Sequence, residues 1–155
     1  MEAQHFKLVT ITPVIVPAAY GSGDQIGAGL LSLGAVALGK GFVRLVEATV
    51  IDNIKQSIAC DLLFFSDNVA VASSDNGAAD VTDALMKTNF LGSISFATYI
   101  ALNASSYSQL TPNKVLKSDL DTGLIYALPV SRGTPTYAGA GDLSFRLLFE
   151  QVSRG

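Results

Sequence analysis

The chain has few of the residues on which catalysis and covalent cross-linking usually depend. Its 155 residues include one cysteine, one histidine and no tryptophan. The single cysteine, Cys60, excludes a disulfide within the chain, and it is best interpreted as a small buried hydrophobic residue of a protein made in a reducing cytoplasm. His5 has no neighbour in an HxH or HExxH pattern, so we interpret it as a solvated residue near the N-terminus. These shortages argue against an enzyme and predict no cofactor.

Charged residues are also scarce, at 15% of the chain against about a quarter in an average soluble protein. The net charge is −3 and no run of like charge occurs, whereas a nucleic-acid-binding protein normally displays a basic stripe. No apolar run approaches the roughly 20 residues of a membrane-spanning helix, and the first residues do not resemble a secretory signal. We therefore expect no binding to nucleic acid or membrane, and a charge-poor surface that another protein or another copy covers.

Two loops contain residues that could bind a ligand, and both are better interpreted as turns. The segment GSGDQIG has glycines at 21, 23 and 27, whereas a dinucleotide-binding loop needs them at 21, 23 and 26. The acidic loop 67–80 could offer oxygen atoms to calcium, but its spacing is not that of an EF-hand. Glycine and Asx residues in loops usually form turns, so we expect no metal site. The calcium candidates were Asp67, Asp75, Asn76 and Asp80.

The plainest strand pattern lies between residues 124 and 149. Apolar and polar residues alternate over 143–149, which gives a strand one buried and one exposed face, and only Leu148 interrupts the exposed face. The segment 124–130 is apolar on both faces, so we expect it to be covered from both sides or to face another subunit. We interpret the two segments as a hairpin joined by the glycine-rich turn 131–141.

A second hairpin is predicted over residues 42–65, where two apolar segments flank the polar turn 52–57. Asp61 lies in the middle of its second strand. A carboxylate at such a position needs a cationic partner, backbone donors or an exposed location. The candidate cationic partners are Arg44, Arg132 and Arg146.

The segment 6–16 is rich in β-branched residues and predicts another strand. Pro13 cannot donate a hydrogen bond to a neighbouring strand, so we expect this strand at a sheet edge, at a bulge, or in an arm that lies on a neighbour. A short helix is predicted near residues 80–89, with Asp80 as its N-cap. The remaining strands are predicted at 30–38, 90–102 and 114–120.

These segments together predict an all-β fold, either an antiparallel β-sandwich or a jelly-roll-like barrel. The strands do not alternate with crossover helices, which disfavours a parallel α/β sheet. No repeat or linker divides the chain, so residues 1–155 are expected to form one β-rich domain, with residues 1–20 as an extended N-terminal arm or an edge strand.

Two segments are candidates for contact with other proteins. The arm over 9–17 is apolar and contains two prolines, and the turn 131–141 carries arginine and tyrosine, which are enriched at the centres of interfaces. The predicted contact residues are Val9, Ile11, Pro13, Ile15, Pro17, Arg132, Pro135 and Tyr137.

Four segments together resemble small virion proteins of tailed bacteriophages, some of which are head decoration or cement proteins. The segments are ITPVIVPAAYGSGDQIG, VEATVIDNIKQSIACDLLFFSDN, FLGSISFATYIAL and LIYALPVSRGTPTY…LSFRLLFEQ. The resemblance covers almost the whole chain, but it consists of packing and turn motifs without a chemical signature.

The resemblance implies a β-sandwich or jelly-roll-like protein, assembled as a trimer, that is made in the host cytoplasm and sits on the outer capsid surface. Its expected partners are the major capsid protein and further copies of itself. Two alternatives remain open at this point. One is a virion adhesion or carbohydrate-binding module that uses the aromatic residues Tyr99, Tyr107 and Tyr137, and the other is a structural protein of the tail or baseplate.

Overall fold

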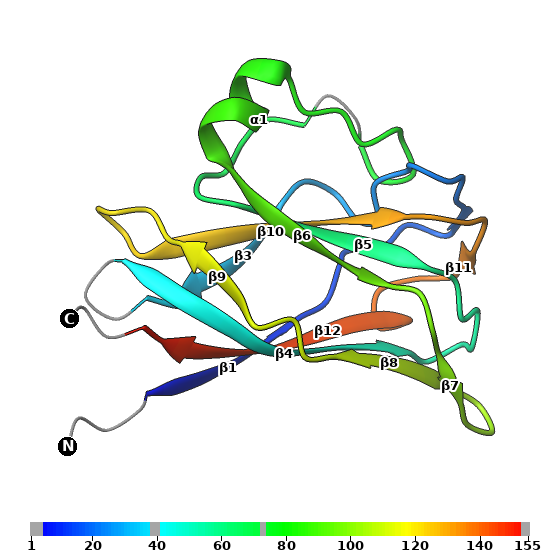
Figure 1. Ribbon diagram of the computed structural model, residues 1–155. Helices are drawn as coiled ribbons and strands as arrows, with labels where there is room; N and C mark the ends of the chain where they lie inside the picture. Colours follow the sequence, from blue (N-terminus) through cyan, green and yellow to red (C-terminus); the bar gives the residue numbers. More distant parts are fainter. Residues whose placement is uncertain (1–4, 38–40, 72–73, 153–155) are drawn as a thin grey trace.

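Two antiparallel sheets pack against each other in the computed structural model, which describes residues 5–37, 41–71 and 74–152 (Figure 1). The larger sheet has the order β1–β12–β4–β8–β7, and β9 also pairs with β4. Its strands are β1 (Phe6–Ile11), β4 (Phe42–Asp52), β7 (Ile100–Ala101), β8 (Ser106–Leu110), β9 (Lys114–Lys117) and β12 (Leu143–Gln151).

The smaller sheet has the order β3–β10–β5–β6. Its strands are β3 (Leu31–Ala35), β5 (Cys60–Phe65), β6 (Phe90–Phe96) and β10 (Leu124–Ser131). A short ribbon joins β2 (Ala18–Ala19) to β11 (Thr136–Tyr137), and one helix, α1 (Asp83–Asn89), precedes β6. The predicted all-β sandwich is therefore confirmed.

Apolar side chains from the inner faces of the two sheets fill the space between them. The rings of Phe96 on β6 and Phe145 on β12 meet across this space, with their centroids 5.9 Å apart. Because side chains alternate between the two faces of a strand, every second residue of these strands enters the core. Other fully buried members are Leu45, Leu62, Phe64, Leu116, Ile125 and Phe149.

Both predicted hairpins are wrong. β10 and β12 lie in different sheets, and so do β4 and β5. β12 pairs with β1 and β4, whereas β10 pairs with β3 and β5. Each connection instead carries the chain across the roughly 10 Å that separate two packed sheets. Alternating apolar residues look the same in both arrangements, because in each case one face of every strand is buried.

The β4–β5 connection crosses between the sheets by means of a capped turn. The carboxylate of Asp52, which is 1% exposed, accepts hydrogen bonds from the backbone N–H groups of Ile54 and Ser57 at 3.1 and 2.7 Å. Lys55 and Ser57 have φ angles of 56° and 53°, in the left-handed region. These bonds satisfy backbone donors that no strand partner reaches, so the polar segment ends β4 and redirects the chain.

The outer face of the smaller sheet is covered by the chain itself. Phe65, Leu128 and Val130 form a second apolar cluster with Val69, and side chains of the segment 79–86 pack against it. Figure 1 shows α1 and its preceding loop lying over this sheet. This confirms that the segment 124–130 is covered from both sides, and residues of the same chain supply the cover on each side.

Three further expectations are resolved along the chain. Among the described strands β1 pairs with β12 alone, so the predicted edge position is confirmed, and the strand ends at Ile11, before Pro13. The predicted helix is present but begins later, because the side chain of Thr82, and not that of Asp80, accepts the capping bond from the backbone of Leu85. The predicted strand 90–102 is two strands, β6 and β7, which lie in different sheets.

Candidate interaction surface

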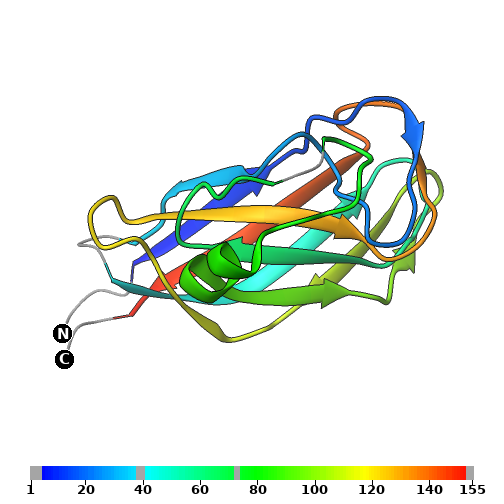
Figure 2. The ribbon, with the colours of Figure 1, turned by 90° about the horizontal axis from the view of Figure 1, so that it is seen from above.

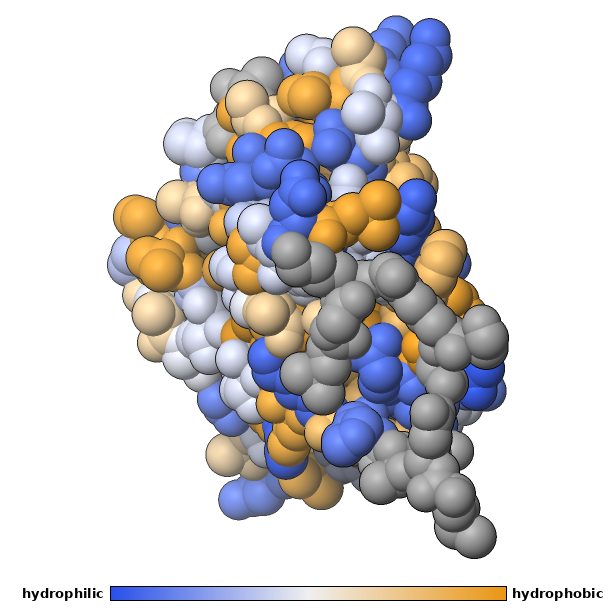
Figure 3. Space-filling view, turned by 90° about the vertical axis from the view of Figure 1, so that its left-hand side faces the viewer, coloured by the Kyte–Doolittle hydropathy of each residue, from blue (hydrophilic) through white to orange (hydrophobic). Residues whose placement is uncertain are grey.

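The two predicted contact segments lie side by side at one end of the sandwich. β2 pairs with β11 in the register Ala18 to Tyr137 and Ala19 to Thr136, and the backbone N–H of Tyr20 donates to the carbonyl of Pro135 at 2.9 Å. Figure 2 shows both segments at the end opposite the starts of β1 and β4. Figure 3 shows the other end of the sandwich, where hydrophilic and hydrophobic residues are interspersed. We call residues 12–20 and 132–142 together the arm–turn surface.

Asp75 fixes the arm to the body of the protein. Its carboxylate accepts three hydrogen bonds of 2.7 Å each, from the backbone N–H groups of Val16 and Gly27 and from the hydroxyl of Tyr20. Burial, and after it the hydrogen bond and negative charge of Asp75, raise the pKa of the Tyr20 phenol above its ordinary value. Asp75 was considered above as a calcium ligand, but both of its carboxylate oxygens accept hydrogen bonds from protein groups.

Gly27 shows why the segment GSGDQIG is rich in glycine. Its φ angle is 89°, and a Cβ atom at this position would lie 2.9 Å from the Cβ of Pro13. Only glycine fits both the left-handed backbone and this close approach of the arm. The segment is therefore a packing turn beneath the arm, in agreement with its interpretation from sequence.

Most of the predicted contact residues are buried. Tyr137 is 1% exposed and packs edge-on against the ring of Tyr20, with the ring centroids 5.6 Å apart. The contact residues were predicted from residue type. Residue type does not distinguish a position in the core from one in an interface, so the prediction included side chains that point inward. The buried residues are Ile11, Pro13, Ile15, Pro135 and Tyr137, while Val9 is half-buried and Pro17 and Arg132 are exposed.

The exposed apolar residues of the arm are those between the predicted ones. Val14 and Val16 are 63% and 60% exposed, and they flank the buried Ile15. The predicted contact residues Ile11, Pro13 and Ile15 thus lie on the buried side of the arm, and the side that faces solvent was not predicted. The tie from Asp75 to the backbone of Val16 holds these two side chains in place.

Arg132 is held at the other side of this surface by an ion pair. Its Nε donates to Oδ2 of Asp61 at 2.6 Å, and the hydroxyl of Ser95 donates to the other carboxylate oxygen at 2.6 Å. One of the three predicted arginine partners of Asp61 is thus confirmed. The pair leaves the guanidinium of Arg132 largely exposed and restrains its position.

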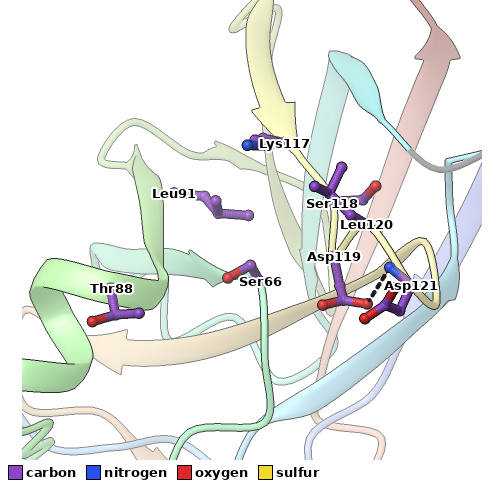
Figure 4. Close-up of a pocket in the computed structure, with 8 residues that line it drawn as sticks. All are labelled: Ser66, Thr88, Leu91, Lys117, Ser118, Asp119, Leu120 and Asp121. Atoms are coloured by element: carbon purple, nitrogen blue, oxygen red, sulfur yellow. Dashed lines mark hydrogen bonds between the residues drawn. The ribbon is translucent and has the colours of Figure 1, made fainter.

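A shallow pocket of about 360 Å³ lies between α1 and the β9–β10 turn (Figure 4). The carboxylate of Asp119 accepts hydrogen bonds from the backbone N–H groups of Asp121 and Thr122, at 2.9 and 2.7 Å, so it serves to form its own turn. The lining residues contain no nucleophile with an adjacent base. They are Ser66, Thr88, Leu91, Lys117, Ser118, Asp119, Leu120 and Asp121.

Cys60 is buried in the core, as its sequence context predicted. Its side chain is 2% exposed, and its Sγ lies 3.7 Å from the hydroxyl of Tyr99. Burial raises the pKa of the thiol to about 12. The thiol is therefore protonated at neutral pH and inert as a nucleophile.

The buried acids predict a loss of stability in alkali. Burial raises the pKa of the phenols of Tyr20, Tyr99 and Tyr137, as well as that of the Cys60 thiol, above the ordinary values of 10.0 and 9.0. The folded protein thus keeps protons that the unfolded chain releases, so stability is full below pH 9 and falls above it. At pH values where the unfolded chain has released a group's proton and the folded protein has not, that group lowers the free energy of unfolding by about 1.4 kcal/mol per pH unit.

Urea unfolding at pH values from 7 to 11 measures this decline. Cys60→Ala is the informative comparison, because it removes the group that titrates first in the unfolded chain. Its free energy of unfolding should stay level to about pH 10, where the tyrosines begin to titrate. A wild-type free energy of unfolding that is constant from pH 7 to 11 would contradict the raised pKa values of the buried thiol and phenols.

No helix within the described residues is long and apolar enough to cross a membrane. The described residues also contain no group of three or more histidine, cysteine or acidic side chains that could hold a metal ion. In comparisons with known proteins, no family model matches the chain and no curated protein matches it.

Proposed function

We propose that the chain is a structural protein of a tailed-bacteriophage virion, which decorates the outer capsid surface and stabilises contacts between major capsid subunits. The resemblance described above, which covers almost the whole sequence, supports this proposal. The all-β sandwich fold and the low content of charged residues also support it. A decoration protein acts by burying surface between neighbouring subunits, and it needs no catalytic group.

The observation that carries the proposal is the arm–turn surface. It presents Val14 and Val16 as exposed apolar side chains on a segment without regular structure. Three hydrogen bonds to Asp75 fix this segment before it meets a partner. A contact that is ordered in advance loses less conformational entropy on binding, so more of its burial free energy appears as affinity.

The strength of such a contact is modest for one copy and large for many. Burying two valine side chains contributes about 3 kcal/mol, which corresponds to a factor of roughly 150 in affinity. Several copies linked on one lattice add through effective concentration. A protein that holds a shell together needs many such contacts whose binding free energies add up.

Replacement of both valines by aspartate is expected to weaken binding to capsids by roughly 100-fold or more. The test uses purified capsids that lack the chain, with bound protein measured by co-sedimentation over a range of concentrations. Leu120→Asp is the matched control, since Leu120 is 53% exposed and lies in the β9–β10 turn at the other end of the sandwich. Its binding should equal that of the wild type.

Two results would overturn the proposal. One is a wild-type chain that fails to bind capsids and is absent from purified heads. The other is a double aspartate variant that is folded and binds as tightly as the wild type, which would remove the arm from the contact. Cryo-electron microscopy of the virion separates a head location from the tail or baseplate alternative.

The positions of the three tyrosines give no support to the carbohydrate-binding alternative. It required exposed aromatic residues, but Tyr137 is buried and the hydroxyl of Tyr99 lies against the Cys60 thiol. Tyr107 is half-buried on β8. The three side chains therefore do not form the exposed stacking platform that this hypothesis assumed.

A further inference from the structure

The outer face of the larger sheet is uncovered. In the described part of the chain no helix or loop lies over it, whereas residues 69–71 and 79–86 cover the outer face of the smaller sheet. In Figure 1 the larger sheet forms the lower layer, with its outer face directed away from the rest of the molecule. We call the outward-facing side chains of β1, β12, β4, β8 and β9 the open face.

Apolar side chains occupy the side of the open face formed by β1 and β12. Leu8 lies directly opposite Leu148 in the β1–β12 pair, and Phe6 is two residues away on the same face. Phe6 and Leu8 are each 54% exposed. Leu148 is the residue that interrupts the polar alternation of its strand, and the structure places it at the centre of this apolar group.

Charged side chains of both signs surround this apolar group. Arg44 and Glu150 form an ion pair of 3.4 Å. Glu47 lies opposite Leu148 in the β12–β4 pair, and Arg146 is two residues from Leu148 on β12. The side chains of Glu47 and Arg146 form no ion pair or hydrogen bond within the described residues. These four charges cancel, with one unpaired acid and one unpaired base beside the same leucine.

The size of the open face suits a specific interface. β8 and β9 both pair with the same edge of β4, so the face has four strand positions. A strand spacing of about 4.8 Å over four positions and a rise of about 3.4 Å over eight residues give roughly 19 by 27 Å, or about 520 Å². Two such faces would bury about 1,040 Å² in total, which reaches the roughly 1,000 Å² that a specific protein–protein interface needs. The face of one molecule is thus large enough to hold a second copy.

We propose that two copies of this chain pack open face to open face around a two-fold axis. Leu8 and Leu148 of both copies lie at the centre, and Arg146 of each copy pairs with Glu47 of the partner subunit. An isologous interface requires a surface that complements itself, and one unpaired acid and one unpaired base beside the same leucine allow each copy to complement the other. The resemblance implied a trimer, whereas this face pairs two copies.

Charge reversal tests the pairing directly. The wild type should have a mass of about 32 kDa by sedimentation equilibrium, twice the 16.2 kDa of one chain. Arg146→Glu and Glu47→Arg should each place like charges opposite one another and weaken association at least 100-fold, to a 16.2 kDa species. The double variant R146E/E47R should restore the dimer, because it exchanges the charges.

Lys87→Glu on α1 is the matched control, because it makes the same charge change as Arg146→Glu away from the open face. It should remain dimeric. Leu8→Lys supplies a second disruption that depends on the apolar centre instead of the charges. Circular dichroism checks that each variant is folded.

The proposal is overturned by a wild type that is monomeric at 100 μM or trimeric, by single reversals that leave the dimer intact, or by a double variant that stays monomeric. The arm–turn surface is not part of this interface. Failure to dimerise is therefore distinguishable from failure to bind capsids.

Discussion

Phe145→Ala is expected to lower the free energy of unfolding by about 4 kcal/mol. Phe145 is fully buried on β12, the strand that pairs with both β1 and β4, and its ring packs against that of Phe96 in the opposite sheet. Truncation removes the buried ring from both sheets and leaves a cavity that the rigid strands cannot close. Urea unfolding followed by circular dichroism measures the loss.

Phe42→Ala is the control for this prediction. Phe42 lies in the same sheet but is 46% exposed, so its truncation should cost less than about 1 kcal/mol. Similar losses for the two variants would mean that the space between the sheets is not the main core. Since a domain is stable by only about 5–15 kcal/mol, Phe145→Ala should also lower the melting temperature markedly.

Asp75→Ala is expected to destabilise the protein by about 3 kcal/mol. The substitution leaves three donors without their charged acceptor, and two of them, the hydroxyl of Tyr20 and the N–H of Gly27, are partly buried. Hydrogen bonds to a charged group contribute about 1.5–3 kcal/mol each, but their losses are not additive, and water can reach the exposed N–H of Val16. Chemical unfolding gives the total.

Hydrogen exchange then locates the effect of this substitution. The amides of Val16 and Gly27 should exchange faster in the variant, while amides in β4 and β12 lose protection only in proportion to global stability. Asp80→Ala is the comparison, because Asp80 is exposed in the same acidic loop and should change stability by no more than about 0.5 kcal/mol. Equal effects of the two substitutions would remove Asp75 from its anchoring role.

Local chemistry predicted the elements of this fold better than their arrangement. The strand periods, the short helix, the edge position of β1 and the arginine partner of Asp61 all follow from residues that lie close in sequence or from the need to neutralise one charge. Strand pairing does not follow in this way. The alternation in β12 determines which side chains are buried, but it does not determine which strand lies beside it.

The contact surface was predicted in part for a similar reason. The sequence selected the arm and the turn, and the β2–β11 ribbon brings them together. It selected the wrong face of the arm, because the period of two specifies two faces without saying which one is covered. The buried face of the arm lies against Gly27, and Asp75 binds the backbone of Val16. Both residues are distant from Val16 in sequence, so no local pattern connects them to it.

The position of β12 has a consequence for how the protein is made. β12 is the last strand of the described chain, yet it lies between β1, the first, and β4. On the ribosome, β1 therefore waits without a hydrogen-bonding neighbour until residues 143–151 emerge, and the longest loop closure comes last. A chain that ended before residue 143 would leave β1 and one edge of β4 without a hydrogen-bonding partner, and we expect such unpaired strand edges to promote aggregation.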